Sequence, residues 1–201
     1  VRALCDPSEA AIAACREKCG CPEARRYEEY QALCGDPAVD WVCIGSWNVF
    51  HKDHIMAAMA AGKHVFAEKP LVTTLEDCVA VKAAAERFEG IFSMGFVLRY
   101  APFYRRVREL IEDGVLGKLV SLEFNETLGH DHGGYIMADW RRLRRHAGTH
   151  LLEKCCHDID LANWISGSLP VKAASFGGLD FFRPENAHHM ERVGVSPKGE
   201  P

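Results

Sequence analysis

The feature of this sequence that most restricts its fold is a repeated alternation of short apolar runs with helical patterns. The apolar runs cover residues 1–4, 41–44, 64–67 and 91–94, and the helical patterns cover residues 8–19, 27–33, 49–61 and 74–88. Strands that alternate with helices in this way form βαβ units, in which the strands are parallel. Ser8 and Thr74 suit helix N-caps, and Gly20 and Gly62 suit the position beyond a helix end. The sequence therefore predicts an α/β fold with a doubly wound parallel sheet.

The pattern changes after residue 95. Helical patterns cover residues 101–113 and 151–165, residues 118–124 alternate apolar and polar side chains, and residues 171–179 again favour a strand. Alternation with period two is typical of a half-exposed antiparallel strand. We therefore expect residues 1–95 to form one domain and residues 96–201 a second, partial α+β domain. The tail after Pro184 has no periodicity.

The charge balance argues against several classes of partner. The chain of 201 residues has a formal net charge of −4, which disfavours a surface built for nucleic acid or an anionic membrane. No stretch approaches the roughly 18 consecutive apolar residues of a membrane span. The one basic cluster comprises Arg141, Arg142, Arg144 and Arg145. Because no aromatic stacking pattern accompanies it, we expect a solvated or anion-facing segment there.

The nine cysteines do not indicate a disulfide scaffold. Most lie inside apolar runs, as Cys43 does, where a thiol behaves as a small hydrophobe. We therefore expect a reducing, cytoplasmic compartment.

Asp6 has the context of a ribose-binding carboxylate, because it follows directly on the first predicted strand. Such a residue comes about 20 residues after a strand, a glycine-rich turn and a helix that hold the dinucleotide phosphates. That glycine-rich loop is absent from the sequence, so we expect the chain to be a fragment of a dehydrogenase. The alternative is that Asp6 only opens a turn with Pro7.

Glu68, Lys69 and Pro70 end the strand predicted at residues 64–67. Ligands of open α/β sheets bind outside the carboxyl ends of the strands, and the proline holds Lys69 in an extended conformation, with a cis bond possible in principle. An ammonium there can stabilise developing charge on a substrate hydroxyl. The alternative is an ordinary strand-end turn with a solvated lysine.

Glu153 and His157 lie four residues apart on the helix predicted at residues 151–165, and Asp160 extends the same face. A carboxylate near an imidazole raises its basicity, which suits a histidine that accepts the proton of an alcohol. The alternative is a surface pair accompanied by a second, helix-stabilising pair between Lys154 and Asp158.

No metal site is expected. Cys15, Cys19 and Cys21 lack the paired spacing of structural zinc ligands. A polar loop that lines a substrate pocket is a better interpretation of His130 and His132 than a chelate.

Several ordered motifs resemble the Gfo/Idh/MocA family, the relatives of glucose-fructose oxidoreductase and inositol dehydrogenase. Residues 61–70, Ala-Gly-Lys-His-Val-Phe-Ala-Glu-Lys-Pro, match the family signature almost residue for residue. Residues 39–51, 95–100, 139–141 and 157–160 resemble further family segments in the same order.

The resemblance implies a partial Rossmann domain followed by a partial domain with an open-faced, mainly antiparallel sheet. It implies that Lys69 contacts the reacting hydroxyl and that His157 accepts its proton. Glu153 matches a position usually held by aspartate, and Cys155 replaces a common glycine, so the chain belongs to a divergent branch. At the ribose-binding position, Asp6 would repel a 2′-phosphate and favour NAD over NADP.

The expected site contains two overlapping sets of residues. For the cofactor we expect contacts from Asp6, Ser46, Trp47, Asn48, His51, Glu68 and Lys69. For the substrate we expect contacts from Lys69, Arg99, His130, His132, Tyr135, Trp140, Glu153 and His157.

The predicted activity is hydride transfer between a nicotinamide cofactor and a secondary hydroxyl of a sugar or cyclic polyol. Lys69, His157 and Glu153 are the predicted catalytic residues. The alternatives are an NAD-dependent glycosidase of the same superfamily and a non-catalytic regulator that senses nucleotide or sugar. We expect the intact protein to be a homo-oligomer and the fragment itself to be inactive.

Overall fold

A computed structural model describes residues 1–137, 139–181 and 183–193, with only the backbone described for His130, Asp131 and Val193. The chain divides into two compact units, Val1–Ser168 and Leu169–Pro201.

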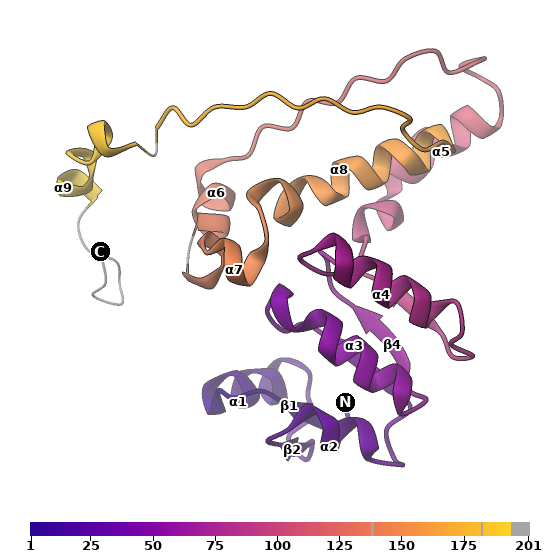
Figure 1. Ribbon diagram of the computed structural model, residues 1–201, viewed down its shortest axis with the longest axis vertical. Helices are drawn as coiled ribbons and strands as arrows, with labels where there is room; N and C mark the ends of the chain where they lie inside the picture. Colours follow the sequence, from indigo (N-terminus) through magenta and orange to yellow (C-terminus); the bar gives the residue numbers. More distant parts are fainter. Residues whose placement is uncertain (138, 182, 194–201) are drawn as a thin grey trace. The chain divides into compact units, whose positions relative to one another are not determined.

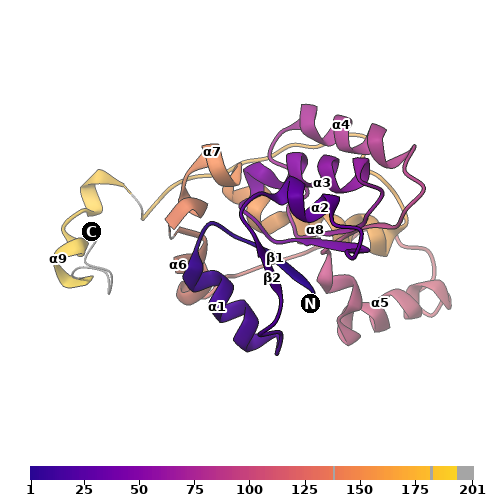
Figure 2. The same ribbon diagram turned by 90° about the horizontal axis from the view of Figure 1, so that it is seen from below.

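Five short parallel strands form the sheets of the first unit, as the alternation of the sequence predicts. They are β1 (Ala3–Cys5), β2 (Arg25–Tyr27), β3 (Trp41–Ile44), β4 (His64–Ala67) and β5 (Phe92–Met94). Strand β1 pairs with β2, and β3, β4 and β5 form a second sheet in that order. Figure 2 shows β1 and β2 side by side. The parallel, Rossmann-like arrangement is thus confirmed.

Helices alternate with the strands along the chain, and their bounds are close to the predicted ones. They are α1 (Glu9–Lys18), α2 (Tyr30–Gly35), α3 (His51–Ala60) and α4 (Leu75–Ala85), with the 3₁₀ turn η1 (Asn48–Phe50) before α3. Ser8 Oγ accepts the N–H of Ala11 and Thr74 Oγ1 accepts that of Asp77, so both predicted N-caps are confirmed. The helix expected at residues 27–33 is displaced, because Tyr27 belongs to β2 and α2 begins at Tyr30.

The core lies between the three-stranded sheet and its helices. Ile55 of α3, Val65 of β4 and Val81 of α4 are fully buried and belong to one cluster. Figures 1 and 2 show α2, α3 and α4 alongside one another, with α3 in the middle. This core fixes the carboxyl ends of β3 and β4, from which the site residues extend.

Replacing Thr74 by alanine is expected to lower the free energy of unfolding by about 1 kcal/mol, the usual contribution of a helix N-cap. Its Oγ1 is 3.1 Å from the backbone nitrogen of Asp77. Urea denaturation checks this, with Thr73→Ala as the matched control because Thr73 precedes the cap. An equal loss in both variants would contradict the assigned cap.

The remaining regular elements described in the first unit are helices and 3₁₀ turns. They are η2 (Val97–Tyr100), α5 (Pro102–Glu112), α6 (His130–Met137), η3 (Asp139–Arg142), α7 (Arg144–Ala147) and α8 (His150–Ser166). The predicted helices at 101–113 and 151–165 are confirmed as α5 and α8, and the two pack against each other. Segments α6, η3 and α7 lie where the sequence suggested a polar, glycine-bearing loop.

The two strands predicted in the second half are wrong. Residues 118–124 and 171–179 form no regular structure, and Val120 and Val171 are 89% and 96% exposed. A strand is stabilised by hydrogen bonds to neighbouring strands, and an isolated extended segment lacks them. Within the described residues neither segment pairs with another strand. The antiparallel sheet expected after residue 95 is therefore not formed there.

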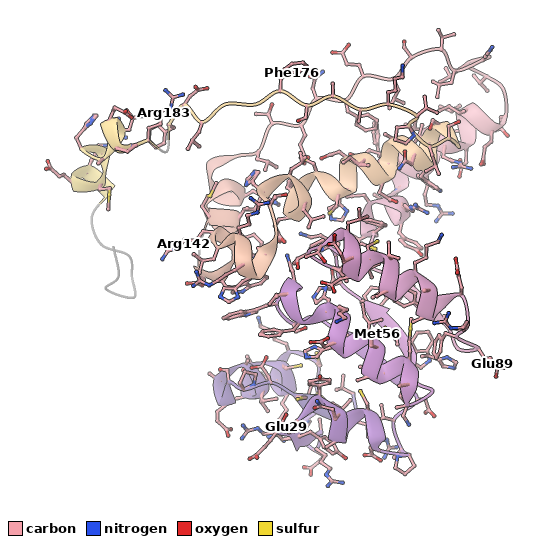
Figure 3. The ribbon with its side chains drawn as sticks, in the orientation of Figure 1. Glu29, Met56, Glu89, Arg142, Phe176 and Arg183 are labelled. Atoms are coloured by element: carbon pink, nitrogen blue, oxygen red, sulfur yellow. The ribbon has the colours of Figure 1, made fainter. Side chains whose placement is uncertain are left out.

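The second unit begins as extended chain and contains η4 (Pro184–Asn186) and α9 (His189–Val193). Its Phe176, labelled in Figure 3, is 96% exposed. Among the described helices of both units, none has the length and apolarity needed to cross a membrane. All nine cysteines are free thiols.

Candidate active site

Three segments bring the candidate catalytic residues together. Lys69 follows the carboxyl end of β4, and Asn48 lies in η1, just after β3. Helix α8 supplies Glu153 in its first turn and His157 one turn later. The Thr149 hydroxyl caps this helix by accepting the N–H of Leu152 at 3.0 Å.

The carboxylate of Glu153 is the centre of the site. It is 3% exposed, and its Oε1 accepts a hydrogen bond from Lys69 Nζ at 3.0 Å. Lys69 Nζ also donates to the Glu153 backbone carbonyl at 2.7 Å. Asn48 Nδ2 donates to Glu153 Oε2 at 2.5 Å and to the carbonyl of Ala147 at 3.0 Å. The buried charge is therefore paired and hydrogen-bonded, as a buried carboxylate must be.

His157 is a neutral base next to this ion pair. Its side chain is buried and packs edge-on against the ring of Phe96. Burial, with the charges of Lys69 and Lys154, holds the pKa of His157 below its ordinary value. Its Nδ1 is buried without a hydrogen-bond partner among the described residues. An uncharged imidazole with a free ring nitrogen can accept a proton from a substrate hydroxyl.

The expected effect of Glu153 on His157 is not found. The sequence predicts that the carboxylate raises the basicity of the histidine, but the pKa of His157 is lowered. The Glu153 carboxylate is turned to Lys69 and Asn48 instead. Shared position on a helix face does not decide where a carboxylate points when cationic and amide donors lie on other segments.

Cys156 lies in the same region but does not suit a nucleophilic role. Its burial raises the pKa of the thiol to about 11, although the charge of Lys69 opposes this. A thiol in this state is neutral near pH 7, and the thiolate is the reactive form. This agrees with the behaviour as small hydrophobes that the sequence predicts for most of the cysteines.

His51 connects the loop after β3 to the turn after β4. It is 1% exposed, and its two ring nitrogens lie 2.8 Å from the Pro70 carbonyl and 2.9 Å from the Ser46 carbonyl. The Lys69–Pro70 peptide bond in the turn after β4 is cis. Both polar atoms of the His51 ring are thus occupied by backbone groups.

The other cofactor candidates lie along the carboxyl ends of the strands. Asp6 follows β1, and its Oδ1 accepts the N–H of Ser8 at 2.8 Å, so it does form the turn that the alternative interpretation expected. Ser46 Oγ contacts His54 Nδ1 at 2.9 Å. Glu68 is exposed, and its Oε2 accepts the N–H of Lys69 at 3.2 Å.

Arg99 is paired rather than free. Its guanidinium makes two hydrogen bonds to the carboxylate of Asp160, Nε to Oδ2 at 2.7 Å and Nη2 to Oδ1 at 2.5 Å. Hydrogen bonding to Asp160 raises the pKa of Arg99. The pair joins η2 to α8. Similarly, Lys154 pairs with Glu126 at 2.5 Å, where the sequence suggested a pair with Asp158.

Trp47 and Trp140 stack on each other, with ring centroids 5.4 Å apart and planes 15° apart. The guanidinium carbon of Arg141 lies 4.4 Å from the Trp140 ring centroid and 4.1 Å from that of Tyr135. A predicted cofactor residue and a predicted substrate residue therefore contact each other directly. Tyr135 also lies edge-on to His132, with centroids 6.2 Å apart, whereas the His130 side chain lies outside the described part.

The amino-terminal part of the chain, residues 1–96, matches the family model described as "Oxidoreductase family, NAD-binding Rossmann fold". Residues 108–194 match its companion model, "Oxidoreductase family, C-terminal alpha/beta domain". The chain belongs to the Gfo/Idh/MocA oxidoreductase family. The resemblance found in the motifs is thereby confirmed.

The relatives include proteins named as sugar and polyol oxidoreductases. An inositol 2-dehydrogenase/D-chiro-inositol 3-dehydrogenase of Lactiplantibacillus plantarum is 26% identical over 86% of this chain. A 1,5-anhydro-D-fructose reductase of Ensifer adhaerens is 32% identical over 72% of the chain. The structure of an aldose-aldose oxidoreductase of Caulobacter crescentus superimposes with a TM-score of 0.68, at 26% identity over 85% of the chain.

The chain spans about half the length of these relatives, namely 45%, 43% and 51% of the three proteins respectively.

Among the described residues, no group of three or more potential metal ligands is arranged to hold an ion.

Sequence reasoning missed three contacts of the site. These are the Asn48–Glu153 hydrogen bond, the Arg99–Asp160 pair and the stacking of Trp47 on Trp140. Each joins residues more than 60 positions apart, so local spacing carried no signal. The family motifs identified most of the site residues but not which of them contact each other.

Proposed function

We propose that this chain forms the catalytic centre of an NAD-dependent dehydrogenase that oxidises a secondary hydroxyl of a sugar or cyclic polyol. The observation that carries the proposal is the meeting of Lys69, Glu153 and the neutral His157 at the carboxyl end of β4. The names of the inositol and anhydro-sugar relatives support this substrate class. Residues 1–95 would bind the cofactor, and residues 96–201 would bind the substrate.

The residues at the strand ends fit a nicotinamide dinucleotide. Asp6 keeps one carboxylate oxygen, Oδ2, for ribose hydroxyls while Oδ1 holds the turn, which favours NAD over NADP. Trp47 is 42% exposed and offers a surface for the cofactor beside Ser46 and Glu68. When bound, the nicotinamide supplies the carbon that accepts the hydride.

His51 and Asn48 act as positioning residues in this proposal. The His51 ring holds the Ser46 loop against the Lys69–Pro70 turn, and Asn48 fixes the Glu153 carboxylate. Both ring nitrogens of His51 and the amide nitrogen of Asn48 are engaged by the protein, so we assign both residues a positioning role in place of the direct cofactor contact that the sequence suggested.

The protein groups have separate tasks in the reaction. The Lys69 ammonium, held by Glu153, donates a hydrogen bond to the substrate oxygen and stabilises negative charge as the O–H bond breaks. The imidazole of His157, whose low pKa keeps it neutral, accepts the hydroxyl proton. The carbon loses a hydride as its oxygen loses the proton, so a ketone and a protonated imidazole result.

The pH dependence of kcat/KM for oxidation is expected to report the protonation of His157. The reaction needs the neutral imidazole, so activity falls as the pH decreases through the pKa of His157, which lies below the ordinary value of about 6.5. Because the charge of Lys69 contributes to this low pKa, the fall moves to higher pH in Lys69→Met. Residual activity is measured as NADH formation from pH 5 to 8, and an unmoved profile would contradict the coupling.

A substrate screen tests the proposed reaction itself. NADH formation is followed with myo-inositol, other cyclic polyols and common sugars, with His157→Asn as the inactive control. Calorimetry measures whether NAD binds. Formation of NADH that needs His157 supports the proposal. Release of a reducing sugar from a glycoside without net NADH would replace it with the glycosidase, and nucleotide binding without turnover would replace it with a regulator.

Two wider features are proposed for the protein as well. Its free thiols suit a reducing, cytoplasmic environment. We also expect self-association, which sedimentation velocity would detect.

A further inference from the structure

A cleft between α6, η3 and the start of α8 has a strongly positive lining. Its volume is about 270 Å³. Three arginines line it, Arg141, Arg142 and Arg144, together with Thr149 and His150 at the start of α8. Figure 3 labels Arg142 on this part of the molecule. No acidic residue is among the described residues that line the cleft.

Of the three cleft arginines, Arg141 has a distant carboxylate partner, and the other two have none among the described residues. Arg141 Nε lies 3.9 Å from Glu153 Oε1, too far for a hydrogen bond, and it is buried with no hydrogen-bond partner in the described chain. The Glu153 carboxylate is already held by Lys69 and Asn48. Arg142 and Arg144 are exposed and form no ion pair with any described residue. Three guanidinium groups therefore line one small space, and two of them have no carboxylate partner in the described part of the chain.

Two parts of the cleft, the Arg141 side chain and the start of α8, are held in position by their surroundings. The Arg141 guanidinium contacts the rings of both Tyr135 and Trp140, which restricts its movement. Helix α8 begins at the cleft, because Gly148 adopts a φ of +88° just before the Thr149 cap. L residues rarely adopt this backbone conformation, so this entry to the helix favours glycine. The first N–H groups of the 17-residue helix lack intrahelical acceptors and add positive potential.

We propose that this cleft binds an anionic oxygen group, a carboxylate or a phosphate, carried by the substrate. Guanidinium groups pair with both through parallel N–H···O bonds. The cleft is slightly smaller than the roughly 300 Å³ lower limit of common ligand pockets, which suits one charged substituent rather than a whole sugar. Arg141 joins the cleft to Glu153. This inference rests on the proposed function, and it narrows the substrate to a sugar acid or a sugar phosphate.

Calorimetric titrations test the cleft without any turnover. The ligands are inorganic phosphate, D-glucuronate, D-glucose 6-phosphate and neutral D-glucose. The variant is Arg142→Gln/Arg144→Gln. Arg145→Gln is the matched control, because Arg145 is an exposed arginine of the same helix, α7, that does not line the cleft.

We expect the anions to bind. The double variant should lower their affinity at least about tenfold, as the loss of charge-assisted hydrogen bonds predicts. The control should change the affinity less than about twofold, the level expected for a screened surface charge. Tighter binding of glucuronate indicates a carboxylate ligand, and tighter binding of glucose 6-phosphate indicates a phosphate. Equal weakening by Arg145→Gln, no weakening in the double variant, or no binding of any anion overturns the proposal.

The two proposals fail in distinguishable ways. If the protein binds anions, loses that binding in the double variant and forms no NADH with any sugar, the result supports the anion-binding cleft and contradicts the dehydrogenase proposal. If the protein oxidises neutral polyols equally well in Arg142→Gln/Arg144→Gln and binds no anion, only the proposal for the cleft is contradicted.

Discussion

Replacing Lys69 by methionine is expected to lower kcat/KM for the oxidation by about 10²–10³-fold, the usual effect of removing one donor to a developing oxyanion. Methionine keeps an unbranched stem but loses the ammonium that Glu153 holds at 3.0 Å. The substrate oxygen then loses the group that stabilises its charge as the proton leaves. Most of the loss should appear in kcat, because the interaction strengthens in the transition state. Steady-state NADH formation measures it.

Lys63→Met is the control for this prediction. Lys63 Nζ donates to the Asp36 backbone carbonyl at 2.9 Å, and Lys63 precedes β4 whereas Lys69 follows it. Its replacement should leave kcat/KM within about twofold, as for a surface change away from the site. Retention of more than a tenth of the activity in Lys69→Met, with NAD still bound, would show that Lys69 does not contact the reacting oxygen.

The sheet could be predicted where a strand is marked by its own residues. Residues 41–44 and 64–67 are apolar runs with clear boundaries, and they form β3 and β4 with those bounds. Strand β2 could not be found this way, because Arg25, Arg26 and Tyr27 carry no apolar run. It exists because its backbone pairs in parallel with β1, and such pairing across the sequence leaves no local pattern.

The wrong strands have the opposite explanation. Residues 118–124 show the correct alternation, yet Val120 is 89% exposed. Alternation describes a segment that suits a half-buried sheet, but a sheet also needs neighbouring strands. The pattern therefore indicated that the segment suits a sheet, but it did not indicate whether a neighbouring strand pairs with it.

The candidate site shows the same difference between membership and arrangement. The motifs identified Lys69, Glu153 and His157, but spacing on α8 paired Glu153 with His157. In the structure Glu153 contacts Lys69, which is 84 positions away, and Asn48, which is 105 positions away. These contacts depend on how β3, β4 and α8 pack. A short-range rule such as the i, i+4 relation identifies a shared helix face and leaves the partner of each side chain open.

Replacing Asn48 by aspartate is expected to destabilise the fold by about 3–5 kcal/mol near pH 8, the usual cost of leaving a buried charge uncompensated. Asn48 and Glu153 are both 3% exposed, and the Asn48 amide donates to Glu153 Oε2 at 2.5 Å. Aspartate has nearly the same shape, but it places a second carboxylate there and removes the donor to the Ala147 carbonyl. Two carboxylates at this separation cannot both ionise easily.

The loss of stability should therefore depend on pH. The introduced carboxyl would have a pKa in the folded protein above the value of about 3.9 of unfolded aspartate. The folded state then binds more protons between these two values, so stability is retained at low pH and is lost as the pH rises through the folded pKa, by up to about 1.4 kcal/mol per pH unit. Urea denaturation from pH 5 to pH 8 measures this slope relative to the unaltered protein.

Asn125→Asp is the matched control, because the Asn125 amide also contacts a carboxylate, Glu123 Oε1 at 3.1 Å, but both residues are exposed. Solvent screens the new repulsion, so the control should lose no more than about 0.5 kcal/mol and show no added slope. If Asn48→Asp behaves like this control, Asn48 does not hold the Glu153 carboxylate in a buried contact. The positioning of Lys69 by Glu153 would then need another explanation.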